Sequence, residues 1–570
     1  MAVVKIPYQG YCCISRPRLL LHFPTLLFAA AYWITVYALW VGLDFGTHWD
    51  EAIQYALVVK SYQYQLLLPH FYHYPAMIYW LDLVSVSDKL FAIVYRTVHT
   101  AGSLGALSSF PPEKPGELNV VGEVPFDFRL FIFRARALAM LVSSLGAVWV
   151  FLSLRSADLA RPALAAALGG SAYILSWEFG YHARWLAPDL ILAQFVALFV
   201  FFVVKADRAE NPRGWLTSAA VAAGLATATK YTAGGLVPAL WVYVLVRGCC
   251  SRRALLATIA RHTAVAVGVF LVITPGTLLE PLRVASDMVF EMHHYANSHG
   301  KWHGVAFYDI NSHWLYLVRL WEYFSLAMLS SQPVIAGVLV AVSILGLVRS
   351  WYRSKPLAAV IGFLIVFYSV YFSLQVVFVV RNFLLLLPVF TYLTGVGFDA
   401  LIDHEFKMPV GRRRQAAIFA TSVTLAFAFG WNAWQQVAFG RSIADAKMEP
   451  LVSQVMEYLE QHASVPMALS PCLAADLATG GALPANVTEP SRALRYIFRF
   501  SELRRSSADL AFWPAARHNS FDWIGPREVN LNYYPSWAGE DHAVILAIDV
   551  AEHMGVAEAL SHDCPTLSSR

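Results

Sequence analysis

The chain has 570 residues, of which 58% are hydrophobic and only 14% are charged, and its mean hydropathy is +0.52. An ordinary soluble domain is about 45–50% apolar and about 25% charged, so that class is excluded. The net charge of +4 does not point to nucleic acid, and no nucleic-acid partner is expected. Apolar runs long enough to cross a bilayer core of about 30 Å recur along the chain. The sequence therefore predicts an all-α polytopic membrane protein.

About eleven transmembrane helices are expected. Their predicted ranges are 20–41, 131–152, 163–180, 186–204, 214–229, 234–247, 263–279, 332–348, 357–374, 383–399 and 415–434. If the N-terminus is cytoplasmic, the loops on that side hold nearly all the Lys and Arg near the membrane, and the alternate short loops hold almost none. The positive-inside rule therefore predicts a cytoplasmic N-terminus and an outer C-terminus. No cleavable signal peptide is expected, because the first apolar run is long and lacks a small-residue cleavage site.

Three segments are then expected on the outer face: a first loop over 42–130, a second over 280–331, and everything from 435 onward. The last segment alternates helix-like text (SQVMEYLEQHA) with strand-like text (VPMALS, ADLAFW, HAVILAID), which predicts a small α/β domain. We expect a transmembrane domain over 1–434 and an extracytoplasmic α/β domain over 435–570. Cys472 and Cys564 are the two outer cysteines, either bridged or free. Asn486 stands in a formal glycosylation sequon.

Charged residues recur at the predicted outer ends of the spans. They are Asp50 and Glu51 in HWDEAIQY, Arg184 and Asp189 in FGYHARWLAPDLILAQF, Lys230 in GLATATKYTAGG, and Arg381 in VVRNFLLLLP. A charge at membrane depth costs about 2.5–3.5 kcal/mol on insertion scales, so it normally faces a partner or a polar cavity. Four such sites on one face predict a shared polar cavity. Its cations suit a phosphate group, and a carboxylate there suits general-base chemistry on a hydroxyl.

These motifs also resemble a known family. DEAIQY, HFYHYPAMIYW, RALAMLVSSLGAVWVFL with Arg136, the PD motif with Asp189, GLATATKY, TPGTLLEPLRVASDMVF with HHYANSHG, and RNFLLLLP occur in the family's order over about residues 20–400. Together they resemble the GT-C superfamily of polyprenyl-phosphate-sugar-dependent glycosyltransferases. The nearest branch looks like the dolichyl-phosphate-mannose–protein mannosyltransferase group, which includes the lipid A aminoarabinose transferase. The first loop and the C-terminal domain depart from the lipid A enzyme.

The resemblance implies roles for particular residues. It implies an inverting transfer of a sugar from a polyprenyl-phosphate carrier to a hydroxyl (or phosphate) group of a lipid, glycan or protein acceptor on the outer face. It maps the catalytic base onto Asp50 and a second acid onto Asp189, and the candidate catalytic residues are Asp50, Glu51 and Asp189. Residues expected to bind the donor phosphate or the substrate are Lys230, Arg381, Arg184, Arg136, His73 and Tyr74. Some family members bind a divalent metal ion and others need none, so the candidate metal ligands Asp50, Asp189, His293 and His294 stay open.

Simpler roles remain for several of these residues. Glu51 would favour the dipole of the following helix, and Tyr72, His73 and Tyr74 would anchor a surface helix at the membrane interface. Two cations have alternatives of the same kind: Arg184 would pair with Asp189, and Lys230 would extend its ammonium to the interface. The His-rich stretch EMHHYANSHGKWHG, which also holds His299 and His303, fits no standard zinc spacing.

The expected localisation is the membrane itself, with a bacterial inner membrane as the favoured case and membrane lipid as a partner. A transporter or flippase of a lipid-linked sugar is the alternative function. Many transporters contain inverted repeats with broken helices in both halves, and this sequence shows no internal repeat. The charges also cluster at one face, whereas a transport path would distribute them. Both observations favour the transferase.

The predicted topology can be tested with reporter fusions. A reporter placed after residue 440 should be active on the outer side, and one placed in the 412–414 arginine loop should be active in the cytoplasm, because basic loops are retained inside. A fusion in the basic loop near Lys205 serves as an internal control for the cytoplasmic side. A cytoplasmic C-terminus would contradict the orientation and would move the charged residues to the wrong face.

Overall fold

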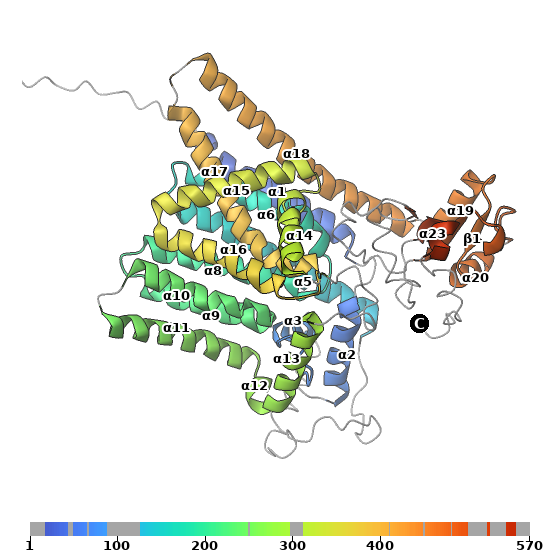
Figure 1. Cartoon of the computed structure of the whole chain (residues 1–570), viewed down its shortest axis with the longest axis horizontal. Coiled ribbons are helices and arrows are strands. Elements are labelled where there is room, and N and C mark those ends of the chain that lie inside the picture. Colours follow the sequence, from blue (N-terminus) through green and yellow to red (C-terminus); the bar gives the residue numbers. More distant parts are fainter. Residues whose placement is uncertain are drawn as a thin grey trace, which may run out of the picture.

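The computed structural model describes residues 18–43, 49–64, 68–87, 126–248, 251–296, 310, 312–407, 409, 411–448, 451–479, 482–499, 521–524 and 543–553. In these ranges the protein is a bundle of long helices followed by a small unit that contains a sheet (Figure 1). It is a polytopic helical membrane protein, as the sequence predicts.

The bundle is formed by helices that run mostly along one direction. Their bounds are α1 (Arg18–Val41), α5 (Phe128–Ser156), α6 (Pro162–Ile174), α7 (Trp177–His182), α8 (Pro188–Arg208), α9 (Arg213–Thr229), η3 (Tyr231–Gly235), α10 (Leu236–Arg247), α11 (Arg252–Ile273), α15 (Pro333–Arg353), α16 (Lys355–Ser373), η5 (Val380–Leu386), α17 (Leu387–Lys407) and α18 (Arg412–Met448). Within the described residues, eight helices are long and apolar enough to cross a membrane, and shorter apolar helices lie between them.

Each of the eleven predicted spans overlaps one or two of these helices, but several predicted bounds are wrong. The predicted span 163–180 is divided into α6 and α7, and the predicted span 383–399 corresponds to α17, which continues to Lys407. Helix α11 covers Arg252–Ile273 instead of 263–279, because Ser251 caps its N-terminus by accepting a hydrogen bond from the Ala254 N–H at 3.2 Å. Helix α18 does not stop at 434 but continues to Met448. Polar side chains of that extension find partners, since the Gln436 amide donates to the carbonyl of Ser176 at 2.9 Å.

A second set of helices lies at one end of the bundle. They are α2 (Trp49–Tyr64), α3 (Met77–Ser85), α12 (Gly276–Leu279), α13 (Pro281–Ala296) and α14 (His313–Leu326). All but α12 come from the two predicted outer loops, whereas α12 lies inside the predicted span 263–279. In Figure 1 these helices gather at the end opposite the α8–α9 and α10–α11 connections. We call this the α2–α13 end of the bundle.

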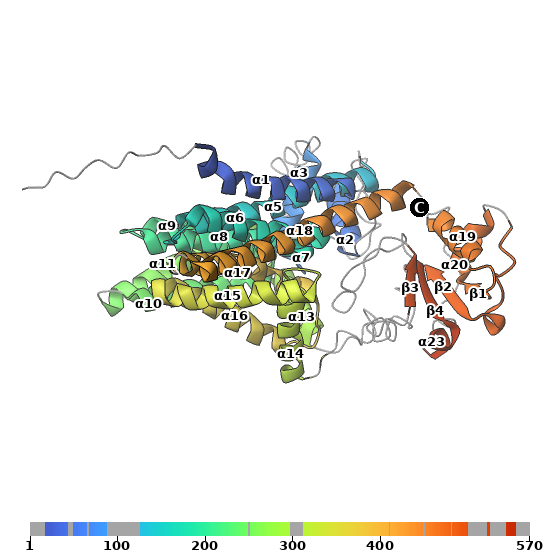
Figure 2. The same cartoon turned by 90° about the horizontal axis from the view of Figure 1, so that it is seen from above.

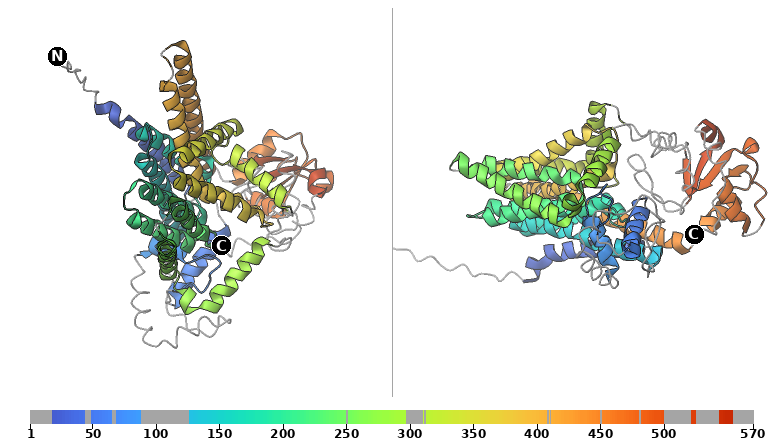
Figure 3. Two further views of the ribbon diagram at one scale, coloured as in Figure 1. Left: turned by 60° about the vertical axis from the view of Figure 1, so that its left-hand side comes forward. Right: turned by 90° about the horizontal axis from the view of Figure 1, so that it is seen from below.

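The C-terminal unit follows α18 and is a mixed α/β structure, as predicted. Its elements are α19 (Leu451–Gln461), β1 (Met467–Leu469), α20 (Pro471–Thr479), η6 (Pro490–Arg492), β2 (Arg495–Arg499), β3 (Phe521–Ile524), β4 (Ala543–Ala547) and α23 (Ile548–His553). The strand order is β1-β2-β4-β3; β1 and β2 are parallel and the other pairs are antiparallel. Figures 2 and 3 show the unit at the far end of α18, beyond the α2–α13 end.

Two details of this unit bear on the sequence predictions. The Asn486 side-chain amide donates to the carbonyls of Leu459 at 2.9 Å and His462 at 3.1 Å, so it ties a loop to the end of α19. Because the same nitrogen would carry a glycan, this geometry does not suit a glycosylation site. The predicted strand at ADLAFW and Cys564 lie outside the described residues, and the backbone of Cys472 lies in α20.

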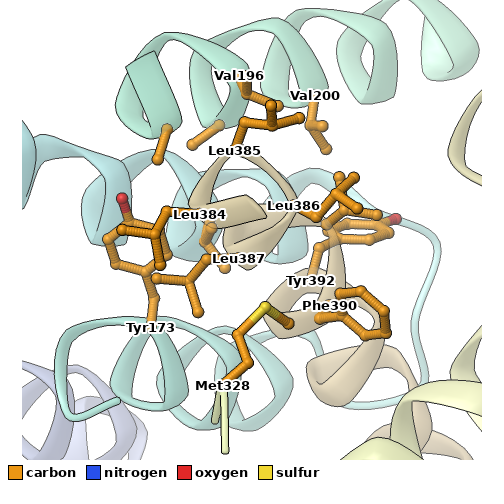
Figure 4. Packing of buried hydrophobic residues seen from close by; sticks show 14 of the residues in the cluster. Tyr173, Val196, Val200, Met328, Leu384, Leu385, Leu386, Leu387, Phe390 and Tyr392 are labelled. Atoms are coloured by element: carbon orange, nitrogen blue, oxygen red, sulfur yellow. The ribbon is translucent and has the colours of Figure 1, made fainter. Parts of the chain in front are cut away.

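The centre of the bundle is packed around the leucine run that follows Arg381. Leu384, Leu385, Leu386 and Leu387 are at most 1% exposed, and Figure 4 shows Leu385 facing Val196 and Val200 of α8 while Met328 and Phe390 lie on the other side. The run begins in the short η5 helix and continues into α17. Such close packing fixes the position of the residues just before it, which include Arg381.

Close contact between helices also depends on small residues. A Cβ at Gly346 of α15 would overlap the backbone oxygen of Leu393, and one at Gly397 of α17 would overlap the backbone oxygen of Val342. Helices in membranes use such glycines to bring their backbones together. α15 and α17 therefore form a rigid pair, which holds the α2–α13 end of α17 in place.

Candidate active site

Four charged side chains from different elements meet at the α2–α13 end of the bundle. Asp50 lies in the first turn of α2, and Asp189 lies in the first turn of α8, directly after Pro188. Lys230 is the residue that ends α9, and Arg381 lies in η5. Each stands at an end of its helix, so the alternation of spans brings all four to one face, as the sequence predicts.

The four side chains form one continuous row of opposite charges. Arg381 Nη1 donates to Asp50 Oδ2 at 2.7 Å, and Arg381 Nε lies 3.7 Å from Asp189 Oδ2. Lys230 Nζ donates to Asp189 Oδ1 at 2.8 Å and to Asn382 Oδ1 at 2.6 Å. All are buried, with exposed fractions of 6% or less. We call Asp50, Arg381, Asp189 and Lys230 the charge row.

The surroundings of Asp50 suit it to accept a proton. Burial raises the pKa of the Asp50 carboxyl and Asp189 adds to the rise, while Arg381 and Lys230 oppose it; the pKa ends above the ordinary aspartate value. A base with a pKa moved toward neutral pH is more effective than an ordinary carboxylate. Burial and the Asp50 charge likewise raise the pKa of Tyr74 well above its ordinary value, so Tyr74 is a neutral hydroxyl beside this site.

Glu51 and Arg136 form a second, closed ion pair. Arg136 Nε donates to Glu51 Oε1 at 2.7 Å and Nη2 donates to Oε2 at 2.6 Å, in a bidentate arrangement. Glu51 Oε1 also accepts the backbone N–H of Leu186 at 3.0 Å, and Arg136 Nη1 donates to the Leu43 carbonyl at 2.7 Å. Both charged side chains are fully buried. The pair joins α2, α5 and the loop before α8, which supports a positioning role for both residues.

The His70–Tyr74 segment is held against α13. The Tyr72 N–H donates to Asp287 at 2.7 Å, the Tyr72 hydroxyl donates to Glu280 at 2.5 Å, and His73 Nδ1 lies 2.7 Å from Glu291. His70 also contacts Glu280 through Nδ1. Tyr72 is completely buried, which is not the position of an aromatic anchor at a membrane interface. We call this set of contacts the loop latch, because it joins the two predicted outer loops.

The loop latch reaches the charge row from two sides. The Tyr231 hydroxyl, one residue after Lys230, donates to the Tyr72 carbonyl at 2.9 Å. Burial raises the pKa of Tyr295 near the end of α13, and the charges of Glu291, Arg381 and Asp50 also act on it. Tyr74 and Tyr295 are therefore two neutral hydroxyl groups on which the charges of Asp50 and Arg381 act.

The remaining predicted residues lie as follows. The Arg184 guanidinium is buried and lies 4.3 Å over the ring of Phe439 in α18, and 6.0 Å from the ring of Trp185. Asp189 is engaged by Lys230 and Arg381, so its ion pairs in the structure differ from the Arg184–Asp189 pair considered from the sequence. Lys230 is 6% exposed and ion-paired, unlike a lysine that extends to the interface.

Several residues at this end were not singled out from the sequence. Asn382 accepts from Lys230, and His182 and Glu178 form a buried contact of 3.3 Å in α7. Burial lowers the pKa of His182 to about 3, so its ring is neutral. Asn382 directly follows Arg381 and His182 stands in FGYHARW, so both lay inside quoted motifs. The sequence does not mark Glu280 and Glu291 of the loop latch as functional, because a single acidic residue in a predicted loop is normally a solvent-exposed side chain.

The candidate metal ligands predicted from the sequence lie in different parts of the structure. Within the described ranges no group of three or more His, Cys, Asp and Glu side chains could hold a metal ion. Asp50 and Asp189 share Arg381 between them, so a cation already stands where a bridging metal would bind. His293 and His294 lie in the last turn of α13. His299 and His303 are outside the described residues. Within the described residues, the candidate ligands considered from the sequence are therefore not gathered into one cluster.

Comparisons with known proteins add the following. A family model described as dolichyl-phosphate-mannose-protein mannosyltransferase matches residues 128–277. This range runs from α5 to α12 and includes Arg136, Asp189 and Lys230. The match agrees with the resemblance read from the sequence over this stretch. A comparison of the sequence with curated proteins gives no significant match.

Solved structures with a similar arrangement were also found. ArnT from Cupriavidus metallidurans bound to undecaprenyl phosphate is 17% identical with a TM-score of 0.45, covering 92% of this chain and 98% of that chain. ArnT in the apo state is 16% identical with a TM-score of 0.47, covering 96% and 100%. The oligosaccharyltransferase AglB from Archaeoglobus fulgidus is 13% identical with a TM-score of 0.44, covering 74% and 56%.

The Glu51–Arg136 pair yields a stability prediction. Arg136→Leu should lower the free energy of unfolding by about 3–5 kcal/mol, because it leaves Glu51 buried without its counter-charge. Thermal unfolding in detergent measures the effect. Arg129→Leu is the matched control, since Arg129 is an exposed residue of the same helix and its loss should change stability by no more than about 0.5 kcal/mol. Replacing both partners with leucine should recover part of the loss; equal stability of Arg136→Leu and Arg129→Leu would contradict the pairing.

Proposed function

We propose that the protein is a membrane glycosyltransferase that moves a sugar from a polyprenyl-phosphate carrier to an acceptor hydroxyl, with inversion, and that Asp50 is the general base. The observation that carries the proposal is the charge row, in which a buried carboxylate with a raised pKa is paired with a buried arginine. The family match over residues 128–277 supports the same class of reaction.

The charge row contains the parts that an inverting transfer needs. Asp50 takes the proton of the acceptor hydroxyl as its oxygen attacks the anomeric carbon. The bond from that carbon to the carrier phosphate oxygen breaks, and the electron pair leaves with the phosphate. Arg381 and Lys230 are the cations that offset the charge on the departing phosphate, the arginine by forked hydrogen bonds and the lysine as a point charge. No oxidant, reductant or further reactant is needed.

The charges of the row balance before and after this step. Two carboxylates and two cations give a formal charge of zero in the resting row. During transfer the carrier phosphate gains one negative charge, and Asp50 loses one by protonation. Once neutral, Asp50 no longer holds the Arg381 guanidinium by ion pairing, so Arg381 is released toward the phosphate at the moment the phosphate charge develops. Stabilisation that strengthens only as charge develops is what accelerates a chemical step.

The neighbouring groups support this arrangement by position. Asp189 is ion-paired with Lys230 and lies near Arg381 Nε, so neither cation pairs with Asp50 alone. The Glu51–Arg136 pair fixes the first turn of α2 and therefore the direction of Asp50. Tyr74 and Tyr295 are neutral hydroxyls near Asp50 and suit hydrogen bonding to a sugar or an acceptor.

A transporter of the same lipid-linked sugar is the alternative function. The described charged groups of this region lie at one end of the bundle and are tied to one another, whereas a transport path needs polar groups at successive depths. This distribution favours the transferase.

The role of Asp50 can be tested by Asp50→Asn, which keeps the shape but removes the basic oxygen. Transfer should fall by about 10²–10⁴-fold, the usual contribution of a positioned base, while the purified variant still binds a polyprenyl-phosphate lipid. The matched control is Asp127→Asn. Asp127 is an exposed aspartate that caps α5 by accepting from the Leu130 N–H at 2.7 Å, and its loss should leave transfer near the wild-type rate. A folded Asp50→Asn protein with full activity would refute the assignment.

The proposal also fixes the direction of a pH dependence. Asp50 must be ionised to act, so the rate should rise with pH through a limb that lies above the ordinary aspartate pKa. Asp189 raises the pKa of Asp50, so Asp189→Asn should move that limb to lower pH; Lys230 lowers it, so Lys230→Gln should move the limb to higher pH. Rates measured between acid and neutral pH, with Asp127→Asn as control, check this. Limbs unmoved in both variants would show that another group titrates.

A further inference from the structure

A groove lies between α15 and α16 at the end of the bundle opposite the charge row. It has a volume of about 480 Å³, and its walls include Leu347, Val348 and Trp351 from α15 and Ala359, Gly362 and Phe363 from α16. The lining is almost entirely apolar. A Cβ added to Gly362 would meet no atom within 4 Å, so the groove is open at that residue. Its volume lies in the range of about 300–1,000 Å³ that is usual for ligand sites.

Both walls of this groove are helices that cross the membrane by length and composition. Val348 is 48% exposed, and the same faces continue with Ile344 at 56% on α15 and Val366 at 61% on α16. An apolar surface of this kind on a membrane-spanning helix faces lipid tails. The groove is therefore a concave part of the lipid-facing surface, and an alkyl chain is the molecule that fits it.

The end of the groove has the residues of a membrane interface. Trp351 is 51% exposed and Tyr352 is 81% exposed, and both stand in the last turn before the Ser354 turn that links α15 to α16. Aromatic side chains of this type concentrate at the level of the lipid head groups. Figure 1 shows this turn at the end of the bundle away from α2 and α3. The long axis of the groove thus runs from the interface into the apolar layer.

A cation lies on the same face of α16 as the groove residues. Lys355 is exposed and opens α16, four residues before Ala359 and seven before Gly362, so all three share one helix face. Helical side chains point toward the N-terminus, so the Lys355 ammonium extends away from the groove toward the interface. The nearby Arg349 is paired with Asp403 at 3.4 Å, and Arg353 is paired with Asp399 at 3.5 Å. Lys355 is the exposed cation on the face of α16 that lines the groove.

We propose that the α15–α16 groove binds one phospholipid with an anionic head group, its acyl chain lying along Ala359, Gly362 and Phe363 and its phosphate beside Lys355. Basic sites between transmembrane helices on the side with the positive loops suit anionic lipids in this way. The site is separate from the charge row, and it does not depend on the proposed transfer reaction.

The experiment uses the full-length protein in nanodiscs of equal parts phosphatidylglycerol and phosphatidylcholine. A trace of either lipid carries a photoactivatable diazirine in one acyl chain, and labelled peptides are mapped by mass spectrometry. The anionic probe should label the Trp351–Phe363 stretch (351–363) above the level on α11, and more than the zwitterionic probe does. Lys355→Gln should reduce the preference for the anionic lipid by about fivefold, the contribution of one basic residue near an anionic surface.

Two variants separate the groove from general lipid contact. Gly362→Leu fills the groove and should reduce labelling at 351–363 to the level on α11. Gly268→Leu is the matched control, because a Cβ at Gly268 of α11 also meets no atom within 4 Å but Gly268 is not a lining residue of the α15–α16 groove; its labelling at 351–363 should match the wild type. Equal labelling of the groove and α11, or labelling unaffected by Gly362→Leu, would overturn the site. Equal labelling by the anionic and the zwitterionic probe would overturn the assignment of an anionic lipid. Crosslinks between two protein chains at the groove would show that a second copy of the protein fills it instead.

Discussion

The structure depends most on Arg381, which stands between two buried carboxylates. Its guanidinium is 2.7 Å from Asp50 and 3.7 Å from Asp189. A buried charge without a partner costs several kcal/mol, so α2, α8 and η5 must keep these three side chains together for the bundle to be stable. The constraint is therefore both architectural and chemical: the interaction that holds the helices together at the α2–α13 end is the same one that would ready Asp50 and Arg381 for a proton and a phosphate.

The rest of the region can be understood as support for that contact. The packed leucines after Arg381 prevent η5 from moving into the bundle. On the other side, the bidentate Glu51–Arg136 pair fixes the first turn of α2, one residue from Asp50. The loop latch then joins the His70–Tyr74 segment to α13, and through Tyr231 to the end of α9 beside Lys230. Each support comes from a different part of the chain, so the site forms only in the complete fold.

Much of this arrangement could be predicted from the sequence, because membrane helices have strong one-dimensional signals. Apolar length gives the spans, and alternation then places Asp50, Asp189, Lys230 and Arg381 on one face before any contact is known. The errors have a shared cause. The sequence places the start of α11 too late because Arg252, Arg253 and Arg261 look like loop residues, and it ends α18 too early because the polar residues of α18 look like the start of a soluble domain.

The sequence does not reveal which polar side chains contact each other. Glu51 and Arg136 are 85 positions apart, and nothing in either local motif states that one neutralises the other. The same holds for Tyr72 with Glu280, where the decisive information is the approach of two long loops. Hydropathy reports how deep a residue lies, but the choice of partner depends on tertiary geometry. For this reason the charged set was predicted as a group, while its division into a charge row, a closed pair and a latch came only with the structure.

The most direct test of the central claim is a transfer assay with the purified wild-type protein in detergent, where no membrane gradient exists. The protein is mixed with polyprenyl-phosphate sugars and a cell-envelope extract as the source of acceptors, and the release of free polyprenyl phosphate is followed together with the mass gained by the acceptor. The account predicts stoichiometric release of the carrier phosphate and glycosylation of an acceptor. Intact donor after prolonged incubation, together with movement of the same donor across the bilayer when the protein is reconstituted in vesicles, would contradict it.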